Sequence, residues 1–307
     1  MKYLYLFVTL CVSATLGAQS IYKSSIDSGG GSASAGNIQV LYTIGEVAVQ
    51  EASAGNIIIS EGFIHSTLNI IINPIAFLQG PYNSPANMTD DLRVSALIPL
   101  STPYADGAST TQDVLDVTGN NAIVDWVWVE LRDKDDNTSV LESTSALLQR
   151  DGNIVSTDGV SPLSFSLNQD TYFVAIAHYN HLSIITAIPI ALASNSTINL
   201  TNNLSIINGG ANAVTDMLDG YYALSGGDFD GNGQVQNTDL TGVLPLLGTS
   251  SYSPADIDMN GQIQNTDINN VLQPNIGKGE QLKSAQTKGK PLTIIAPRKK
   301  TNKTKNL

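Results

Sequence analysis

The strongest restriction on the fold of this chain is a tandem repeat near its C-terminal end. The segment DFDGNGQVQNTDLTGVL begins at Asp228, and DIDMNGQIQNTDINNVL begins at Asp256, 28 residues later. In both copies, oxygen-bearing side chains stand at positions 1, 3, 5 and 12, and a glycine stands at position 6. A loop that surrounds one ion must turn sharply at position 6, which glycine allows at little steric cost. The spacing is that of a twelve-residue calcium-binding loop of EF-hand type.

The chemistry of these positions predicts two calcium ions, one in each loop. Carboxylate, amide and backbone carbonyl oxygens are hard ligands that suit calcium, whereas zinc and copper favour the imidazole and thiolate groups that both loops lack. Position 12 is aspartate in both copies, a shorter arm than the usual glutamate. The predicted ligand residues are Asp228, Asp230, Asn232, Gln234 (through its carbonyl) and Asp239 in the first loop, and Asp256, Asp258, Asn260, Gln262 and Asp267 in the second.

Without an ion, each loop would bring three carboxylates close together. Each pair would repel by about a kcal/mol or more at an effective dielectric constant of about 20, so we expect the loops to gain order when the ion binds. Position 8 is apolar in both copies, Val235 and Ile263, and these residues are expected to join the two loops through a short β-bridge.

The first 18 residues have the pattern of a secretory signal peptide. A lysine precedes an apolar run, and small residues stand before a predicted cleavage site after Ala18. The run is shorter than the roughly 20 residues that span a bilayer, and we expect no transmembrane segment. The single cysteine, Cys11, lies inside this peptide. We therefore expect a secreted or cell-surface protein without disulfides.

Charge is distributed unevenly along the chain, and it argues against a nucleic-acid partner. The formal net charge is −12. Residues 19–277 hold 26 acidic and five basic residues, a composition that repels phosphate backbones and attracts divalent cations. Residues 278–307 hold nine basic residues against Glu280 alone, so this tail is predicted to be a disordered, solvated end.

The central part of the chain predicts mostly β-structure. Short runs rich in β-branched and aromatic residues alternate with polar turns, which is typical of an antiparallel β-sandwich of Ig-like or jelly-roll-like type. Before it, the Gly/Ser-rich stretch SSIDSGGGSASAGN is predicted to be flexible, and residues 38–49 and 56–64 are predicted to pair around the turn EASAG. Later strands are expected at residues 124–131, 139–149, 171–178 and 182–192. The predicted domains are the signal peptide 1–18, an N-terminal β segment 19–67, a central β-sandwich 68–218, a small tandem calcium-loop and short-helix module 219–277, and the basic tail 278–307.

The tandem loops, over residues 228–277, resemble the type I dockerin module. Dockerins consist of two calcium loops, each followed by a helix, and attach enzymes to a scaffold through cohesin domains. The resemblance implies that loop positions 10 and 11 contact a cohesin-like partner. These positions are Asn237 and Thr238 in the first copy and Asn265 and Thr266 in the second. Two features depart from the pattern: Pro245 and Pro274 shorten the helices, since an interior proline costs about 3 kcal/mol, and basic residues expected on a partner-facing helix are missing.

A wider resemblance covers roughly residues 75–277. The strings FLQGPYN, IPLSTPY, VDWVWVELRD, ALLQRDG, FVAIAHYNHL and GDFDGNGQVQNTD occur in this order. They are similar to a region of bacterial surface and secreted proteins described as hemagglutinin-like. The resemblance implies a non-catalytic binding or adhesion role outside the cell, with a glycan or a cell-surface protein as the partner. The alternative is a dockerin-type subunit that docks into an extracellular polysaccharide-processing complex.

Catalysis is not expected, and the enzymatic alternative is a polysaccharide-degrading enzyme. Asp125 and Glu130 would supply its carboxylate pair, but they lie five apart on a predicted strand and so point to opposite faces. His178 and His181 lie three apart, which would likewise place them on opposite faces of one strand and prevent a shared metal.

The chain has only two tryptophans, Trp126 and Trp128, and they share one face of a predicted strand. Two such rings can stack on a sugar. Core packing is nevertheless the expected role of this pair.

Overall fold

The computed structural model of the protein describes residues 29–35, 38–44, 50–54, 57–61 and 69–281. Its contacts divide the chain into two compact units, Met1–Thr67 and Leu68–Leu307. The predicted signal peptide 1–18 and residues 282–307 of the predicted tail lie outside the described residues.

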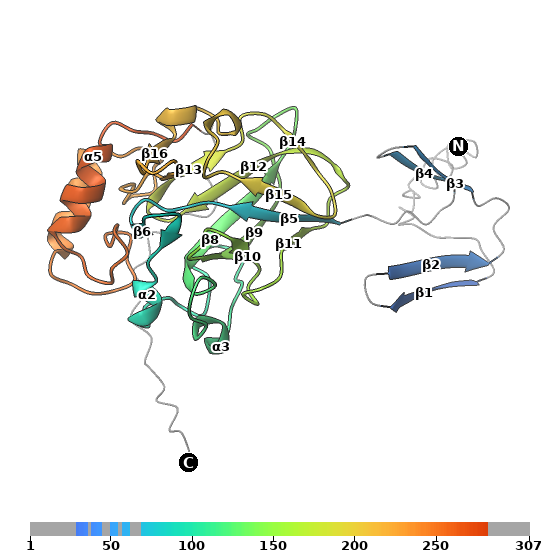
Figure 1. Ribbon diagram of the computed structural model, residues 1–307, viewed down its shortest axis with the longest axis horizontal. Helices are drawn as coiled ribbons and strands as arrows, with labels where there is room; N and C mark the ends of the chain where they lie inside the picture. Colours follow the sequence, from blue (N-terminus) through green and yellow to red (C-terminus); the bar gives the residue numbers. More distant parts are fainter. Residues whose placement is uncertain (1–28, 36–37, 45–49, 55–56, 62–68, 282–307) are drawn as a thin grey trace, which may run out of the picture. The chain divides into compact units, whose positions relative to one another are not determined.

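The first unit contains two antiparallel hairpins in its described part (Figure 1). One pairs β1 (Gly29–Ala35) with β2 (Ile38–Ile44), and the other pairs β3 (Gln50–Ala54) with β4 (Ile57–Glu61). The prediction of one hairpin around the turn EASAG was wrong, because four residues of EASAG belong to β3 and the Gly/Ser-rich stretch supplies β1. In the sequence, each pair of strands is separated by Gly-Asn, a dipeptide that favours tight hairpin connections.

The second unit is mostly β, with antiparallel sheets and a few short helices, as predicted. The strands of its larger sheet are β8 (Ile123–Arg132), β9 (Val140–Gln149), β10 (Ile154–Val155), β12 (Asp170–His178), β13 (His181–Ile185) and β14 (Ile190–Leu192). Their order is β10-β9-β8-β12-β13, and β14 also pairs with β12. The smaller sheet contains β5 (Ile70–Ile75), β11 (Leu163–Phe165) and β15 (Ser196–Asn199), in the order β11-β5-β15.

One buried hydrophobic cluster joins the two sheets into a sandwich. Ile72 of β5, Phe165 of β11 and Ile198 of β15 belong to the same cluster as Trp126 and Val129 of β8. Figure 1 shows the smaller sheet in front of the larger one. All ten residues of β8 are buried, because this central strand is covered on both faces. The predominance of apolar β-branched and aromatic residues in this strand follows from that position.

Two details of the sheets differ from the predicted antiparallel pattern. Strand β15 runs parallel to β5, while the other described strand pairs are antiparallel. The run predicted as one strand over residues 182–192 is divided into β13 and β14, which pair with different parts of β12. Pro189 lies between them, and proline has no N–H with which to continue a ladder.

The remaining elements are short and surround the sheets. They are β6 (Tyr82–Asn83), β7 (Asn87–Met88), α2 (Asp91–Val94), α3 (Gln112–Leu115), η1 (Leu204–Ile206), η2 (Gly210–Asn212), β16 (Val214–Asp216) and β17 (Tyr222–Leu224). The tandem repeat supplies α4 (Asn237–Val243), η3 (Leu244–Leu246), η4 (Asp267–Leu272) and α5 (Gln273–Asn275). Among the described residues, none of these helices has the length and apolar character needed to cross a membrane.

The tandem repeat lies in the same compact unit as the sandwich. It has a buried cluster of its own, and Leu182 of β13 also belongs to that cluster. Residues 278–281, the start of the predicted tail, are part of this unit too, since the Lys278 amine donates hydrogen bonds to the Val214 carbonyl and the Thr215 hydroxyl. The domain boundaries within residues 68–307 remain predictions.

Candidate metal centre

Each of the two loops gathers three carboxylates at one place. In each loop these are the aspartates at positions 1, 3 and 12, whose nearest oxygens lie within 4.8 Å of one another. The aspartates at positions 1 and 12 are fully buried, and those at position 3 are half-buried. The two acidic triads, Asp228, Asp230 and Asp239 in the first loop and Asp256, Asp258 and Asp267 in the second, could therefore hold metal ions.

The aspartate at position 12 closes each loop through backbone hydrogen bonds. Asp239 Oδ1 accepts a bond from the N–H of Asp230 at 3.1 Å, and its Oδ2 accepts one from the N–H of Gln236 at 2.7 Å. The equivalent bonds to Asp267 measure 2.9 and 2.7 Å. The shorter aspartate arm thus reaches back to both ends of its loop in the same way in the two copies.

The predicted ligands at positions 5 and 7 lie next to each other in both loops. Asn232 Oδ1 accepts a bond from the N–H of Gln234 at 2.9 Å, and Asn260 Oδ1 accepts one from the N–H of Gln262 at 2.9 Å. Both glutamines are exposed residues, and their contribution of a backbone carbonyl to an ion remains a prediction.

Two positions in each loop have a left-handed backbone. Position 6 is glycine in both, with φ of 83° at Gly233 and 89° at Gly261, as the loop pattern requires. Position 4 is also left-handed, and here the copies differ: Gly231 has φ 71°, but Met259 has φ 59°. The Met259 side chain is buried in the main hydrophobic cluster of the sandwich. This packing explains why a strained non-glycine residue stands in the second loop.

Burial makes the second loop electrostatically unfavourable without a cation. It raises the pKa of Asp256 to about 8, and the charges of Asp267 and Asp258 contribute further. Burial also raises the pKa of Asp267. In the described structure, Oδ1 of Asp256 is buried and has no hydrogen-bond partner. Such an oxygen is costly to bury, and a divalent cation held by these carboxylates would satisfy it. The residues present therefore fit a calcium ion.

The position-8 residues do not pair with each other, which corrects the predicted β-bridge. Val235 instead pairs with the segment that follows the helix of the second loop, and Ile263 pairs with the segment that follows the helix of the first loop. The N–H of Val235 donates to the Lys278 carbonyl, and the Val235 carbonyl accepts from the N–H of Gly277, both at 2.9 Å. In the second loop, the N–H of Ile263 donates to the Thr249 carbonyl, and the Ile263 carbonyl accepts from the N–H of Gly248, both at 2.8 Å.

The second repeat is one residue longer than the first between position 12 and the glycine that ends the helix. The first copy continues as α4 and η3, whereas the helical segment of the second copy contains the π-helix η4. A π-helical turn accommodates one additional residue, so Gly277 reaches Val235 as Gly248 reaches Ile263. The helices that follow the two loops are short, as predicted from Pro245 and Pro274.

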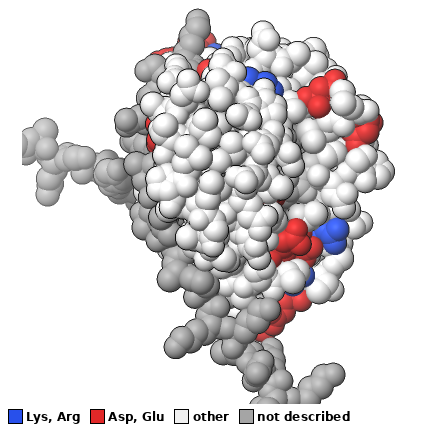
Figure 2. Space-filling model, turned by 90° about the vertical axis from the view of Figure 1, so that its left-hand side faces the viewer, with Lys and Arg blue, Asp and Glu red and all other residues white. Residues whose placement is uncertain are grey.

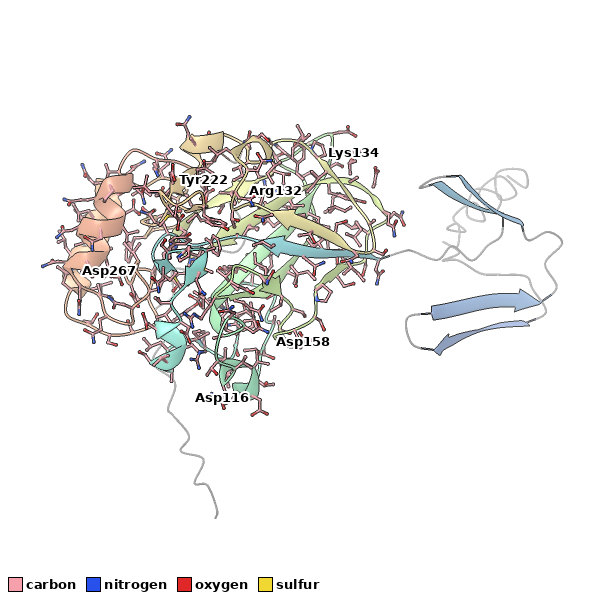
Figure 3. The ribbon with its side chains drawn as sticks, viewed as in Figure 1. Asp116, Arg132, Lys134, Asp158, Tyr222 and Asp267 are labelled. Carbon is pink, nitrogen blue, oxygen red and sulfur yellow. The ribbon has the colours of Figure 1, made fainter. Side chains whose placement is uncertain are left out.

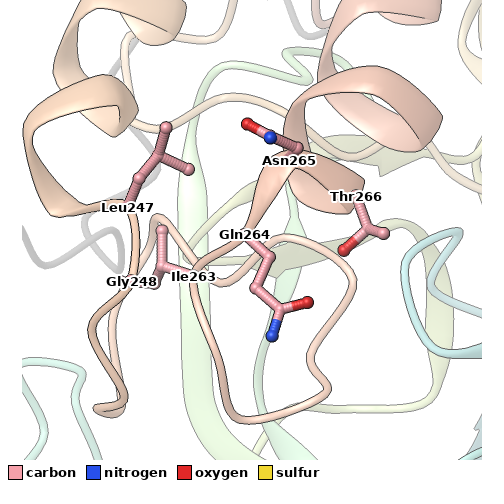
Figure 4. A pocket seen from close by; sticks show the side chains of 6 residues that line it. All are labelled: Leu247, Gly248, Ile263, Gln264, Asn265 and Thr266. Atoms are coloured by element: carbon pink, nitrogen blue, oxygen red, sulfur yellow. The ribbon is translucent and has the colours of Figure 1, made fainter.

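The four residues predicted to contact a partner lie on the surface of the repeat. Asn237, Thr238 and Asn265 are exposed, and Thr266 is half-buried. Asn265 and Thr266 line an open pocket of about 400 Å³ together with Leu247, Gly248, Ile263 and Gln264 (Figure 4). The exposed residues of segments 237–250 and 262–277 include no Asp, Glu, Lys or Arg. Figure 2, which shows this side of the molecule, is correspondingly white over most of its face.

The two histidines lie on neighbouring strands and not on one strand, which corrects the assumption behind their predicted separation. His178 ends β12 and His181 begins β13, and the residues pair across the hairpin. Their Nδ1 atoms lie 3.2 Å apart, and His178 Nε2 lies 3.3 Å from Asp125 Oδ2. Asp125 also accepts a bond from the Tyr252 hydroxyl at 2.8 Å. The histidines therefore belong to a fully buried polar network, in agreement with the structural role predicted for them.

The carboxylates considered as a glycosidase pair belong to separate networks. Glu130 accepts bonds from Trp128 Nε1 at 2.9 Å and forms a buried ion pair with Arg132 at 2.6 Å, whereas Asp125 contacts His178. Figure 3 shows Arg132 among the strands, away from the helical segment that carries Asp267. Trp126 and Trp128 are both buried, which confirms their predicted role in core packing.

Sequence reasoning missed Asn180, which binds the first residue of the second loop and the residue that precedes the first loop. Its side chain donates to the carbonyl of Asp256 at 2.9 Å, and its own carbonyl accepts from the N–H of Gly227, next to Asp228. The contact with Asp256 spans 76 residues of sequence. A lone asparagine in a hairpin turn carries no pattern that would have revealed it.

Comparisons with known proteins add little to this geometry. No protein-family model matches the chain, and no curated protein does. Among solved structures, the chain is similar to two interface mutants, one N-terminal and one C-terminal, of a type II cohesin–X–dockerin complex from Acetivibrio cellulolyticus. The identities are 14% and 13%, both TM-scores are 0.34, and the matches cover 69% of this chain and 96% and 97% of the other chains. A TM-score of this size establishes neither a shared fold nor a shared function.

Proposed function

We propose that the chain is a secreted or cell-surface binding protein without catalytic activity, stabilised by two calcium ions. The observation that carries the calcium sites is the buried Asp256 oxygen, which lacks a hydrogen-bond partner in one of two equivalent acidic triads. Calcium would replace repulsion between carboxylates with attraction in each loop. Because the ion binds the folded loop far better than the unfolded chain, its binding stabilises the fold.

Isothermal titration calorimetry of the full chain tests the two calcium sites. We expect two ions per chain, and we expect the double variant Asp228→Ala/Asp256→Ala to bind neither. The matched control is Asp158→Ala, which removes an aspartate that caps an exposed turn outside the repeat. Unchanged calcium uptake by the double variant would contradict the assignment of these loops.

The binding role rests on the hemagglutinin-like strings, and we propose a glycan or a cell-surface protein as the ligand. A glycan array probed with the full chain, in calcium and in chelator, tests the first of these ligands. A binding role predicts retention on the array or on cells without any change to the ligand. Depolymerisation of a polysaccharide by the purified chain would instead favour the enzymatic alternative.

A second candidate function is docking to a cohesin-like partner, and the surface of the repeat favours it. Asn237 and Thr238 are exposed. Asn265 is exposed as well and lines the open pocket beside Leu247, whereas the hydroxyl oxygen of Thr266 is buried. Because the exposed part of this surface is uncharged, such docking would depend on hydrogen bonds and apolar contacts and would change little with salt.

A pull-down against immobilised cohesin domains tests the docking function. We expect capture of the unaltered chain and weaker capture when Asn237 and Thr238, or Asn265 and Thr266, are replaced by alanine. Alanine at Thr118 and Asn120, an exposed pair outside the repeat, is the control. Absence of capture at any salt concentration would exclude docking to the domains tested.

A further inference from the structure

Asn180 lies in the two-residue turn between β12 and β13 and is fully buried. Its hydrogen bonds reach the starts of both calcium loops. The backbone carbonyl of Asn180 accepts a hydrogen bond at 3.0 Å from the N–H of Gly227, the residue that precedes the first loop. The side-chain amide donates to the carbonyl of Asp256, the first residue of the second loop, at 2.9 Å, and to Pro254 at 3.3 Å.

The orientation of the Asn180 amide follows from its neighbours. The N–H of Gly80 donates to His181 Nε2 at 3.2 Å, so Nδ1 of a neutral His181 carries the proton. That Nδ1 lies 2.7 Å from Asn180 Oδ1 and donates to it. The Asn180 NH₂ group must therefore face the two carbonyls, which can only accept. Each polar atom of this side chain thus has a defined partner.

The hairpin is joined to the repeat by packing as well. His181 forms a β-bridge with Gly226, and the N–H of Leu182 donates to the Ser225 carbonyl at 2.8 Å. The side chain of Leu182 is buried with Val235 and Ile263, the position-8 residues of the two loops. A displacement of either loop start would consequently move the same hairpin.

We propose that Asn180 couples the two calcium sites, so that an ion in one loop raises the affinity of the other; this inference rests on the proposed calcium binding. An ion in the second loop fixes the carbonyl of Asp256, which fixes the Asn180 side chain and holds the turn in place. The carbonyl of Asn180 then holds Gly227 beside the first loop. The second ion binds to a loop whose start is already ordered, so it has less conformational entropy to overcome.

Calorimetry of the full chain tests the coupling. Asp230→Ala silences the first loop and Asp258→Ala silences the second, and each variant gives the association constant of one loop alone. The coupling factor is the product of the two constants of the unaltered chain divided by the product of the two single-loop constants. We expect a factor of about five or more.

Asn180→Ala, combined with the same silencing variants, should reduce the factor to about one, whatever it does to each affinity. Asn208→Ala is the matched control: its side chain bonds to the Gln281 carbonyl, beyond the repeat, and the factor should remain as in the unaltered chain. A coupling factor that persists in Asn180→Ala would overturn the proposal and assign the coupling to the backbone bonds that Val235 and Ile263 make with the segment after the helix of the other loop. A factor of one in the unaltered chain would also overturn it, whereas a chain that binds no calcium would refute the proposed function itself.

A second measurement does not depend on the folding of the Asn180 variant. In Asp230→Ala only the second loop can fill, and calcium should then slow hydrogen exchange at the N–H of Gly227 at least about fivefold. Exchange at Gly227 that stays unchanged while the amides of the second loop slow would overturn the proposal.

Discussion

A β-carbon at Gly80 would lie only 1.9 Å from the carbonyl oxygen of Ile257, because the sandwich and the second loop of the tandem repeat approach each other through bare backbone at this point. Ile257 follows the first ligand position of that loop. This close approach places the start of the second loop against the sandwich.

Gly80→Ala should destabilise the fold by about 1 to 3 kcal/mol, because backbone atoms must move to admit the methyl group. The same shift should weaken calcium binding by the second loop. Denaturant unfolding and calorimetry measure the two effects. Gly279→Ala is the control, since its β-carbon would meet no heavy atom closer than 3.5 Å, and its stability should be almost unchanged.

Met259→Gly weighs two opposing effects at position 4 of the second loop. Glycine would relieve the strain of the left-handed backbone, which would stabilise the fold by about 1 kcal/mol. Loss of the buried methionine side chain would destabilise it by about 2 to 5 kcal/mol. We expect net destabilisation by about 1 to 4 kcal/mol in equilibrium unfolding. A more stable variant would show that strain, and not packing, dominates at this position.

Calcium should reverse the pH dependence of stability. The pKa of Asp256 is raised to about 8 in the folded chain, so without calcium the folded state holds more protons than the unfolded state between about pH 4 and 8. In chelator, the melting temperature should therefore fall as the pH rises through this window. In saturating calcium it should rise, because protons compete with the ion for the carboxylates.

Scanning calorimetry between about pH 4 and 8 measures how the melting temperature changes with pH in chelator and in calcium. Asp256→Asn should flatten the slope in chelator, since it removes the carboxylate whose ionisation opposes folding. Parallel slopes in chelator and calcium would contradict the prediction.

Removal of one partner from the buried Glu130–Arg132 pair should cost about 3 to 5 kcal/mol, because the other charge would remain buried and unpaired. Arg132→Met and Glu130→Leu test this in urea unfolding, and the double variant should lose less than the sum of the two. Lys134→Ala is the control: it removes a solvent-exposed ion pair with Asp170, and the cost should be much smaller than that of either buried substitution.

The tandem loops were predictable because a calcium loop is a local structure. Its ligand positions lie within twelve residues, so the spacing of Asp228, Asn232 and Asp239 defines the loop wherever it packs. The buried strands were predictable for a similar reason, since short runs rich in β-branched and aromatic residues, such as residues 124–131, suit a strand covered on both faces. The turn EASAG was misassigned because small residues are compatible with both a turn and a strand.

The long-range contacts were not predictable in this way. The spacing of His178 and His181 has opposite meanings on one strand and across a hairpin, and only the pairing of β12 with β13 decides between them. The π-helix η4 likewise exists because Gly277 must reach Val235, a requirement that a single helix does not express.

Neighbouring residues thus suffice to specify two oxygen-lined loops, because metal coordination and turn geometry act over a few bonds of the chain. Which surface those loops pack against was decided only by folding: Asn180 and Gly80 become partners of the repeat, and Met259 of the second loop packs into the hydrophobic cluster of the sandwich, through contacts between segments far apart in sequence. Such contacts depend on the positions of whole strands, so no short pattern of residues encodes them.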